Sequence, residues 1–184
     1  MKTENFLLIL CCVVFLPGCA IQAHKYEIAA ENIQILKRSG KSAIRVGEFS
    51  SASPKINALT IRGSTFESPY NGSYEEYLKT AITEDLKQAS HYAADSNIEV
   101  SGVLLKNEFD ASGVNIGTAS ISARVIVNNA GTEKYNKVVT NNHEWESYFA
   151  AFSAVPAAQI GYVDTVRNFL KKLYSDEDFI KACK

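Results

Sequence analysis

The sequence has no excess of charge of either sign and no cluster of residues suited to catalysis. It contains 19 Lys and Arg against 20 Asp and Glu, a formal net charge of −1 at pH 7. Without a basic excess it cannot neutralise a phosphate backbone, so nucleic acid is not an expected partner. The 3 histidines, His24, His91 and His143, have no second ligand at helical or hairpin spacing, and we expect no metal and no cofactor. No serine occupies a sharp, glycine-flanked turn, so we do not expect an enzyme.

Cysteines and long apolar runs are also scarce. The apolar run at residues 6–15 is shorter than the about 20 residues that a membrane-spanning helix needs. With a basic residue ahead of it and small residues behind it, the run is typical of a secretory signal. Of the 4 cysteines, Cys11 and Cys12 lie inside this signal and would be removed with it. If Cys19 is modified, Cys183 is the remaining thiol, and no intramolecular disulfide can form.

The signal ends in Leu16-Pro17-Gly18-Cys19. An aliphatic residue three positions before a cysteine and a small residue directly before it resemble the lipobox of bacterial lipoproteins. This resemblance implies that residues 1–18 are removed by cleavage between Gly18 and Cys19. Cys19 then becomes the lipidated N-terminus, and a thiolate is the side chain best suited to take up an acyl-bearing group. The following Ala20 resembles the second residue of lipoproteins sorted to the outer membrane.

The rest of the sequence predicts one domain at residues 43–184, with residues 19–42 as the lipidated N-terminus and a tether. Loose alternation predicts strands at 43–49 and 58–62, followed by a connecting loop at 63–72. The mixed pattern around residues 26–36 fits either a strand or a short helix.

Two helices are predicted from caps and periodicity. Ser73 can cap a helix, with Glu76 three residues later, and apolar residues then recur at helical spacing as far as Ala93. A second helix is expected to begin around Pro156, a residue favoured in the first turn. Its predicted apolar stripe consists of Ile160, Val163, Val166, Leu170 and Leu173.

Between the helices lies the pattern of a β-meander. Apolar residues alternate with polar ones over residues 119–127, as in a sheet with one buried and one wet face. A return strand is predicted at 135–140 after a turn. Residues 107–117 are predicted to form a long loop, which is a candidate for a functional edge. The order of elements predicts an α+β fold: a two-layer sandwich of a mainly antiparallel sheet with two helices packed on one face.

Two groups of residues are candidates for a partner surface. Aromatic residues gather just before the second helix, and the others lie around the 63–72 loop; the full set is Trp145, Tyr148, Phe149, Phe152, Arg62, Phe66 and Tyr70. Exposed aromatic patches usually mark contacts. The alternative is that the first group plugs the core at the sheet edge and that the two aromatics of the second pin a loop.

The order of elements over residues 43–175, with the Tyr77-Leu78, Ala81-Ile82 and Leu86 pattern in its first helix, resembles YajG-like and LptE-like envelope lipoproteins. The resemblance implies a non-catalytic, periplasm-facing protein of the outer membrane, anchored through lipid on Cys19, that serves an envelope complex or transport system. An envelope protein is the expected partner. The alternative is a secreted or surface-exposed binding module in which the lipobox is incidental.

Overall fold

A four-stranded sheet forms the centre of the protein in the computed structural model, which describes residues 20–40 and 42–184. The signal, its cleavage site and Cys19 lie outside the described residues. Strands β5 (Ile98–Asp110), β6 (Ile116–Asn129) and β7 (Thr132–Glu146) form an antiparallel meander, and β2 (Arg45–Ser51) pairs parallel to β5. The predicted meander is therefore confirmed, while the parallel edge strand was not foreseen.

The sheet has one buried and one wet face, as the alternation predicted. Ala119, Ile121, Ala123, Val125 and Val127 are all buried beneath the helices. The strands are longer than predicted: β5 runs on to Asp110 and β6 begins at Ile116, so the expected 107–117 loop shrinks to residues 111–115. Both extensions are held by the ladder between β5 and β6, a long-range pairing that local sequence does not reveal.

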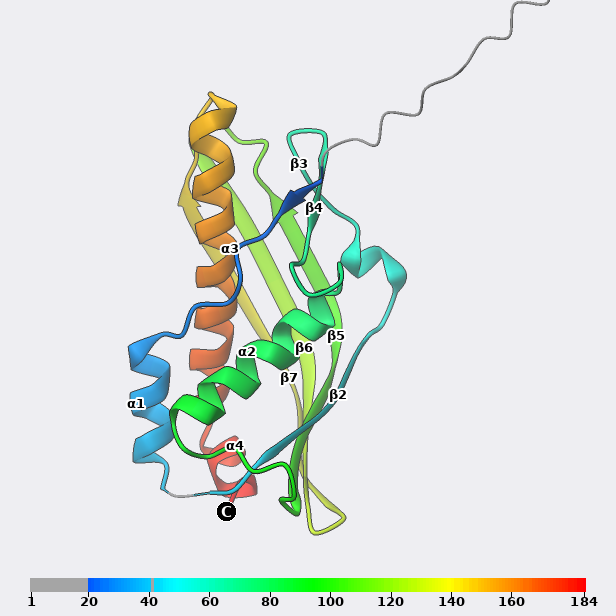
Figure 1. Ribbon diagram of the computed structural model, residues 1–184, viewed down its shortest axis with the longest axis vertical. Coiled ribbons are helices and arrows are strands. Elements are labelled where there is room, and N and C mark those ends of the chain that lie inside the picture. The colour runs from blue at the N-terminus through cyan, green and yellow to red at the C-terminus, as the bar shows by residue number, and fades with distance from the viewer. Residues whose placement is uncertain (1–19, 41) are drawn as a thin grey trace, which may run out of the picture.

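Two long helices, α2 (Tyr74–Gln88) and α3 (Ala151–Tyr174), cover the apolar face of the sheet (Figure 1). This confirms the α+β fold class. The Ser73 hydroxyl accepts a hydrogen bond from the backbone N–H of Glu76 at 3.0 Å, as the capping pattern predicted.

Helix α3 starts at Ala151, five residues earlier than predicted, so Pro156 lies inside it. Its buried face also differs from the predicted stripe. Ile160 is 53% exposed, whereas Tyr162, Phe169 and Tyr174 are buried. The predicted stripe was built from aliphatic residues alone, so it left out these three aromatic side chains of the core.

A second, three-stranded sheet has the order β1-β4-β3 and consists of β1 (Ile21–Gln22), β3 (Leu59–Ile61) and β4 (Ser64–Glu67). Strand β4 lies where the sequence predicted a loop. Arg62 and Gly63 have φ angles of 51° and 82° and make a two-residue turn that folds β4 back on β3. An Arg-Gly pair is not a usual signal for this turn, which is why the hairpin was missed.

Residues expected to form a tether are packed into the domain in the described part of the chain. Ala23 is buried beside β4, and helix α1 (Ala30–Arg38) buries Ile33 and Leu36 against α2 and α3. The Asn32 side chain donates a hydrogen bond to the Arg167 carbonyl at 3.1 Å. The folded unit therefore extends to Ile21 rather than beginning at residue 43.

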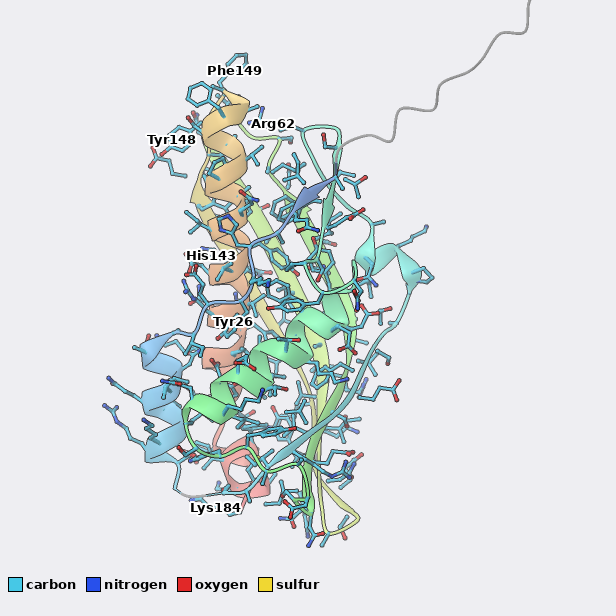
Figure 2. The ribbon with its side chains drawn as sticks, viewed as in Figure 1. Tyr26, Arg62, His143, Tyr148, Phe149 and Lys184 are labelled. Carbon is cyan, nitrogen blue, oxygen red and sulfur yellow. The ribbon has the colours of Figure 1, made fainter. Side chains whose placement is uncertain are left out.

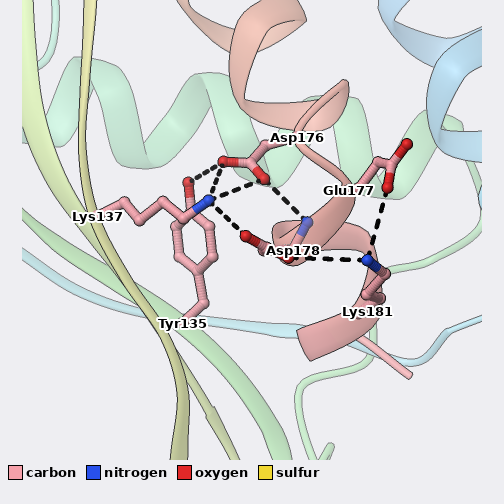
Figure 3. A network of polar contacts seen from close by, with 6 residues as sticks. All are labelled: Tyr135, Lys137, Asp176, Glu177, Asp178 and Lys181. Atoms are coloured by element: carbon pink, nitrogen blue, oxygen red, sulfur yellow. Dashed lines mark hydrogen bonds and ion pairs between the residues drawn. The ribbon is translucent and has the colours of Figure 1, made fainter.

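The C-terminus is held by a polar network around the short helix α4 (Glu177–Ala182), shown in Figure 3. The Lys137 ammonium, on β7, lies 3.0 Å from Asp176 and 2.7 Å from Asp178. The Tyr135 hydroxyl also donates to Asp176 at 3.1 Å. A short helix, η1 (Pro54–Asn57), precedes β3 in the chain.

Candidate interaction surface

Phe66 and Tyr70, predicted as part of a partner surface, belong to the aromatic core. Phe66 is fully buried, stacks on Phe109 with ring centroids 4.6 Å apart and meets Tyr162 edge-on. Tyr70 is half-buried, packs edge-on against Tyr77 at 5.3 Å, and its hydroxyl accepts the Tyr26 N–H at 3.3 Å. Phe66 cannot meet a partner, because other side chains enclose it on all sides.

Trp145 is also a packing residue, which supports the core-plug alternative for this position. Its ring stacks on Phe109 at 5.6 Å and lies between two glycines, Gly117 of β6 and Gly161 of α3. A Cβ atom added to Gly117 or Gly161 would come within 2.4 or 2.3 Å of the indole. Trp145 therefore occupies the space that these two missing side chains leave, and it joins α3 to the sheet.

The remaining predicted residues are found together at one end of the molecule, where the first turn of α3 and the 147–150 segment lie. Phe149 and Phe152 are 79% and 83% exposed, and Tyr148 is 39% exposed. Arg62, on the β3–β4 turn, lies beside them (Figure 2). The 111–115 loop adds the exposed side chain of Val114, and the start of β6 adds that of Ile116. We call Val114, Ile116, Tyr148, Phe149 and Phe152 the tip surface.

Arg62 holds the segments of the tip surface together rather than standing free. Its guanidinium donates to the Tyr148 carbonyl at 2.6 Å and to the Gly113 carbonyl at 3.3 Å. The Ser147 hydroxyl donates to the same Gly113 carbonyl at 2.9 Å. Because these bonds connect three separate segments, the backbone of the tip surface is fixed while its apolar side chains point outward.

Sequence reasoning placed Arg62 near the aromatic residues only by grouping them as candidates. It singled out the 107–117 segment as a candidate functional edge but did not name Val114 or Ile116. The structure brings Arg62, Tyr148, Phe149 and Phe152 together and separates them from Phe66 and Tyr70. The available signal was two β-branched apolar residues within a segment otherwise rich in Gly, Ser and Asn. Apolar residues grouped in such a polar segment suggest an exposed contact.

The uncovered face of the four-stranded sheet is polar and carries a shallow depression of about 500 Å³. Cross-strand hydrogen bonds organise its side chains: Ser120 donates to Asn142 at 2.7 Å, and Arg124 donates to Asn136 at 3.1 Å. The depression is lined by Lys106, Glu108, Asp110, Thr118 and Glu144, among others. Three of these side chains are carboxylates and one is an ammonium, so the depression is acidic and disfavours an anion.

A buried polar cluster lies between the helices. The Tyr26 hydroxyl is 3.0 Å from both carboxylate oxygens of Asp85, a residue with no exposed surface. Burial raises the pKa of Asp85 to about 6, although the hydrogen bond from Tyr26 opposes the shift. The hydrogen bonds of the cluster join the N-terminal segment to α2, and we assign it a structural role.

No group of three or more His, Cys, Asp or Glu side chains within residues 20–40 and 42–184 is arranged to hold a metal ion. In the same residues no helix combines the length and the apolar character needed to cross a bilayer. Burial lowers the pKa of His91, because desolvation disfavours the charged imidazolium. Cys183 is a buried free thiol.

A solved structure shares this fold, and two others were compared with it. The Xanthomonas campestris protein XCC0632, of the DUF330 family, superimposes with a TM-score of 0.54 and 11% identity over 85% of this chain and 94% of its own. A Caulobacter crescentus protein described as a candidate lipoprotein gives 0.46 and 15% identity over 83% and 95% of the two chains. Protein CT253 of Chlamydia trachomatis gives 0.46 and 9% identity over 73% and 96%. At such identities the likeness concerns the fold alone.

No known protein family matches the sequence, and no curated protein matches it.

Proposed function

We propose that this protein is a lipoprotein of the outer membrane, anchored through acyl chains on Cys19 and facing the periplasm. It acts without catalysis as a binding or assembly factor for an envelope complex or transport system. The observation that carries the proposal is the sequence Leu16-Pro17-Gly18-Cys19 directly ahead of a folded domain. Two or more acyl chains give stable anchoring, whereas a single chain binds a membrane only reversibly.

The domain described here starts almost immediately after the proposed anchor. Strand β1 begins at Ile21, and Ala23 is already buried. An anchor on Cys19 would thus hold the domain against the membrane without a long flexible linker. This arrangement favours a factor that works at a fixed place on the membrane over a module that is released into the medium.

The proposed anchoring is tested by examining whether Cys19 is acylated and what its replacement does. We expect mass spectrometry of the native protein to find an N-terminus at Cys19 that carries acyl chains. We also expect Cys19→Ser to move the protein from the membrane fraction to the soluble fraction. An unmodified N-terminus, or a start at another residue, contradicts the proposal and favours the secreted module.

The uncovered face of the four-stranded sheet is the surface that we assign to a protein partner. The helices already cover the other face, and the polar side chains of the uncovered face are pre-ordered by cross-strand hydrogen bonds such as that of Ser120 with Asn142. Polar surfaces with direct and water-mediated hydrogen bonds are usual in non-obligate complexes.

A photo-crosslinkable residue tests this assignment in intact cells. We expect crosslinks to an envelope protein from Thr118 and Asn142, which are exposed on the sheet, and none from Gln88, an exposed residue at the end of α2. Crosslinks from Gln88 alone would place the partner on the helical side instead.

A further inference from the structure

The tip surface gathers five exposed apolar side chains at one end of the molecule. Phe149 and Phe152 are 79% and 83% exposed, and Val114 and Ile116 are 51% and 54% exposed. Their backbone is fixed by the Arg62 hydrogen bonds described above, so these side chains do not fold back on the core. Grouped exposure of this kind marks a contact surface.

The pairing of β1 places the proposed anchor close to this surface. β1 runs parallel to β4, with Ile21 opposite Phe66 and Gln22 opposite Glu67. The chain ahead of Ile21 therefore lies alongside β4 in the direction of the Arg62 turn. At about 3.3 Å per residue, Ala20 lies on the order of 10 Å from that turn. Arg62 in turn bonds to the carbonyl of Tyr148.

A second contact gives the same placement from the helical side. The Gln159 side chain of α3 donates to the Gln22 carbonyl at 2.6 Å. Phe152 precedes Gln159 by about two helical turns, roughly 10 Å along the axis. In Figure 1, β1 and the start of α3 both lie toward the upper end of the molecule, while the C-terminus lies at the lower end.

We propose that the tip surface lies in the interfacial region of the bilayer that holds the Cys19 lipid. This inference rests on the proposed lipid anchor. Because Ala20 is bonded directly to Cys19, anchoring brings this end of the domain to the membrane. Aromatic and aliphatic side chains at that position enter the boundary between headgroups and acyl chains, a depth of about 5–10 Å for amphipathic segments.

The contact depends on apolar insertion rather than on charge. Arg62 lies at the tip, but so do Asp110, at the end of β5, and Glu146, whose carboxylate raises the pKa of Tyr148. The three charges leave no basic patch that would select anionic lipid. We therefore expect insertion to be the same in zwitterionic vesicles and in vesicles that contain phosphatidylglycerol.

The experiment uses the full acylated protein in phospholipid vesicles, with an environment-sensitive fluorophore on a single introduced cysteine. Labelling is specific, because an acylated Cys19 has no thiol, and burial raises the pKa of the Cys183 thiol to about 12. The test variants are Phe149→Cys and Phe152→Cys. The matched control is Val138→Cys on β7, 49% exposed and roughly 25 Å along the strand from its tip end.

Nitroxide-labelled lipid should quench the probes at positions 149 and 152 several-fold more than the probe at 138. Equal quenching at all three positions, with the protein still floating with the vesicles, overturns the membrane contact and leaves the anchor intact. The tip surface would then be open to a protein partner. Failure of the acylated protein to float with vesicles overturns both the anchor and the inference that rests on it.

Discussion

Gly161→Ala tests the view that Trp145 fixes α3 on the sheet. In an ordinary helix interior this change stabilises the folded protein by about 0.5–1 kcal/mol, because alanine loses less backbone entropy on folding than glycine does. Here the new Cβ would come 2.3 Å from Cδ2 of Trp145. Such overpacking typically costs about 1–3 kcal/mol. The indole cannot retreat, because the backbone of Gly117 lies against its other part and Phe109 is stacked on it.

The two effects oppose each other, and the clash is the larger. We expect Gly161→Ala to lower the free energy of unfolding by about 1–2 kcal/mol, or several degrees in the melting temperature of a domain of this size. Urea unfolding followed by far-ultraviolet circular dichroism measures it without relying on tryptophan fluorescence.

A double-mutant cycle provides the control. In the Trp145→Ala background every side-chain atom that the new methyl group would meet is gone, so Gly161→Ala should be neutral or stabilising there. A Gly161→Ala variant as stable as the wild type, or an equal effect in both backgrounds, would refute the reasoning.

Further predictions concern the core, the cap, the C-terminus and the thiol. The pKa of Asp85 is about 6 in the folded protein against 3.8 as its ordinary value. The folded state therefore binds the proton more tightly, and stability falls as pH rises from about 4 to 6. The difference in free energy of unfolding between Asp85→Asn and the wild type should shift by up to about 3 kcal/mol in favour of the variant as the pH rises through this range. A difference that does not change with pH would contradict this. Ser73→Ala should cost about 1 kcal/mol in urea unfolding, while Ser73→Asp, which keeps the cap, should not. Lys137→Ala should speed amide hydrogen exchange in α4, and 1 M salt should reduce the difference if the ion pairs are the cause. Cys183, with its raised pKa, should react with a disulfide reagent only on unfolding.

Local patterns predicted the elements whose signals are contained in a few neighbouring residues. The Ser73 cap, the face of α2 and the alternation over 119–127 each follow from the side chains themselves. Their burial on one side was enough to predict a sheet covered by two helices.

The missed elements depend on residues far apart in the chain. β4 is held by Leu59 across an Arg-Gly turn that lacks the usual sequence signal, and by Ile21, which lies far away in the chain. α1 is held by packing on α2 and α3. The candidate surface was only partly predicted for the same reason. Phe149 is exposed and Phe66 is buried because of what packs over each of them, and residue type alone does not distinguish the two.

The long strands set the distance between the two ends of the domain. β7 runs 15 residues from Thr132 to Glu146, about 50 Å at the usual rise. Glu146 is at the tip end, and the Ala130-Gly131 turn is at the opposite end. With the tip on a bilayer, that turn would stand at a height above the lipid set by strand length and not by a flexible linker. A partner that meets it there would be held at a constant spacing from the membrane.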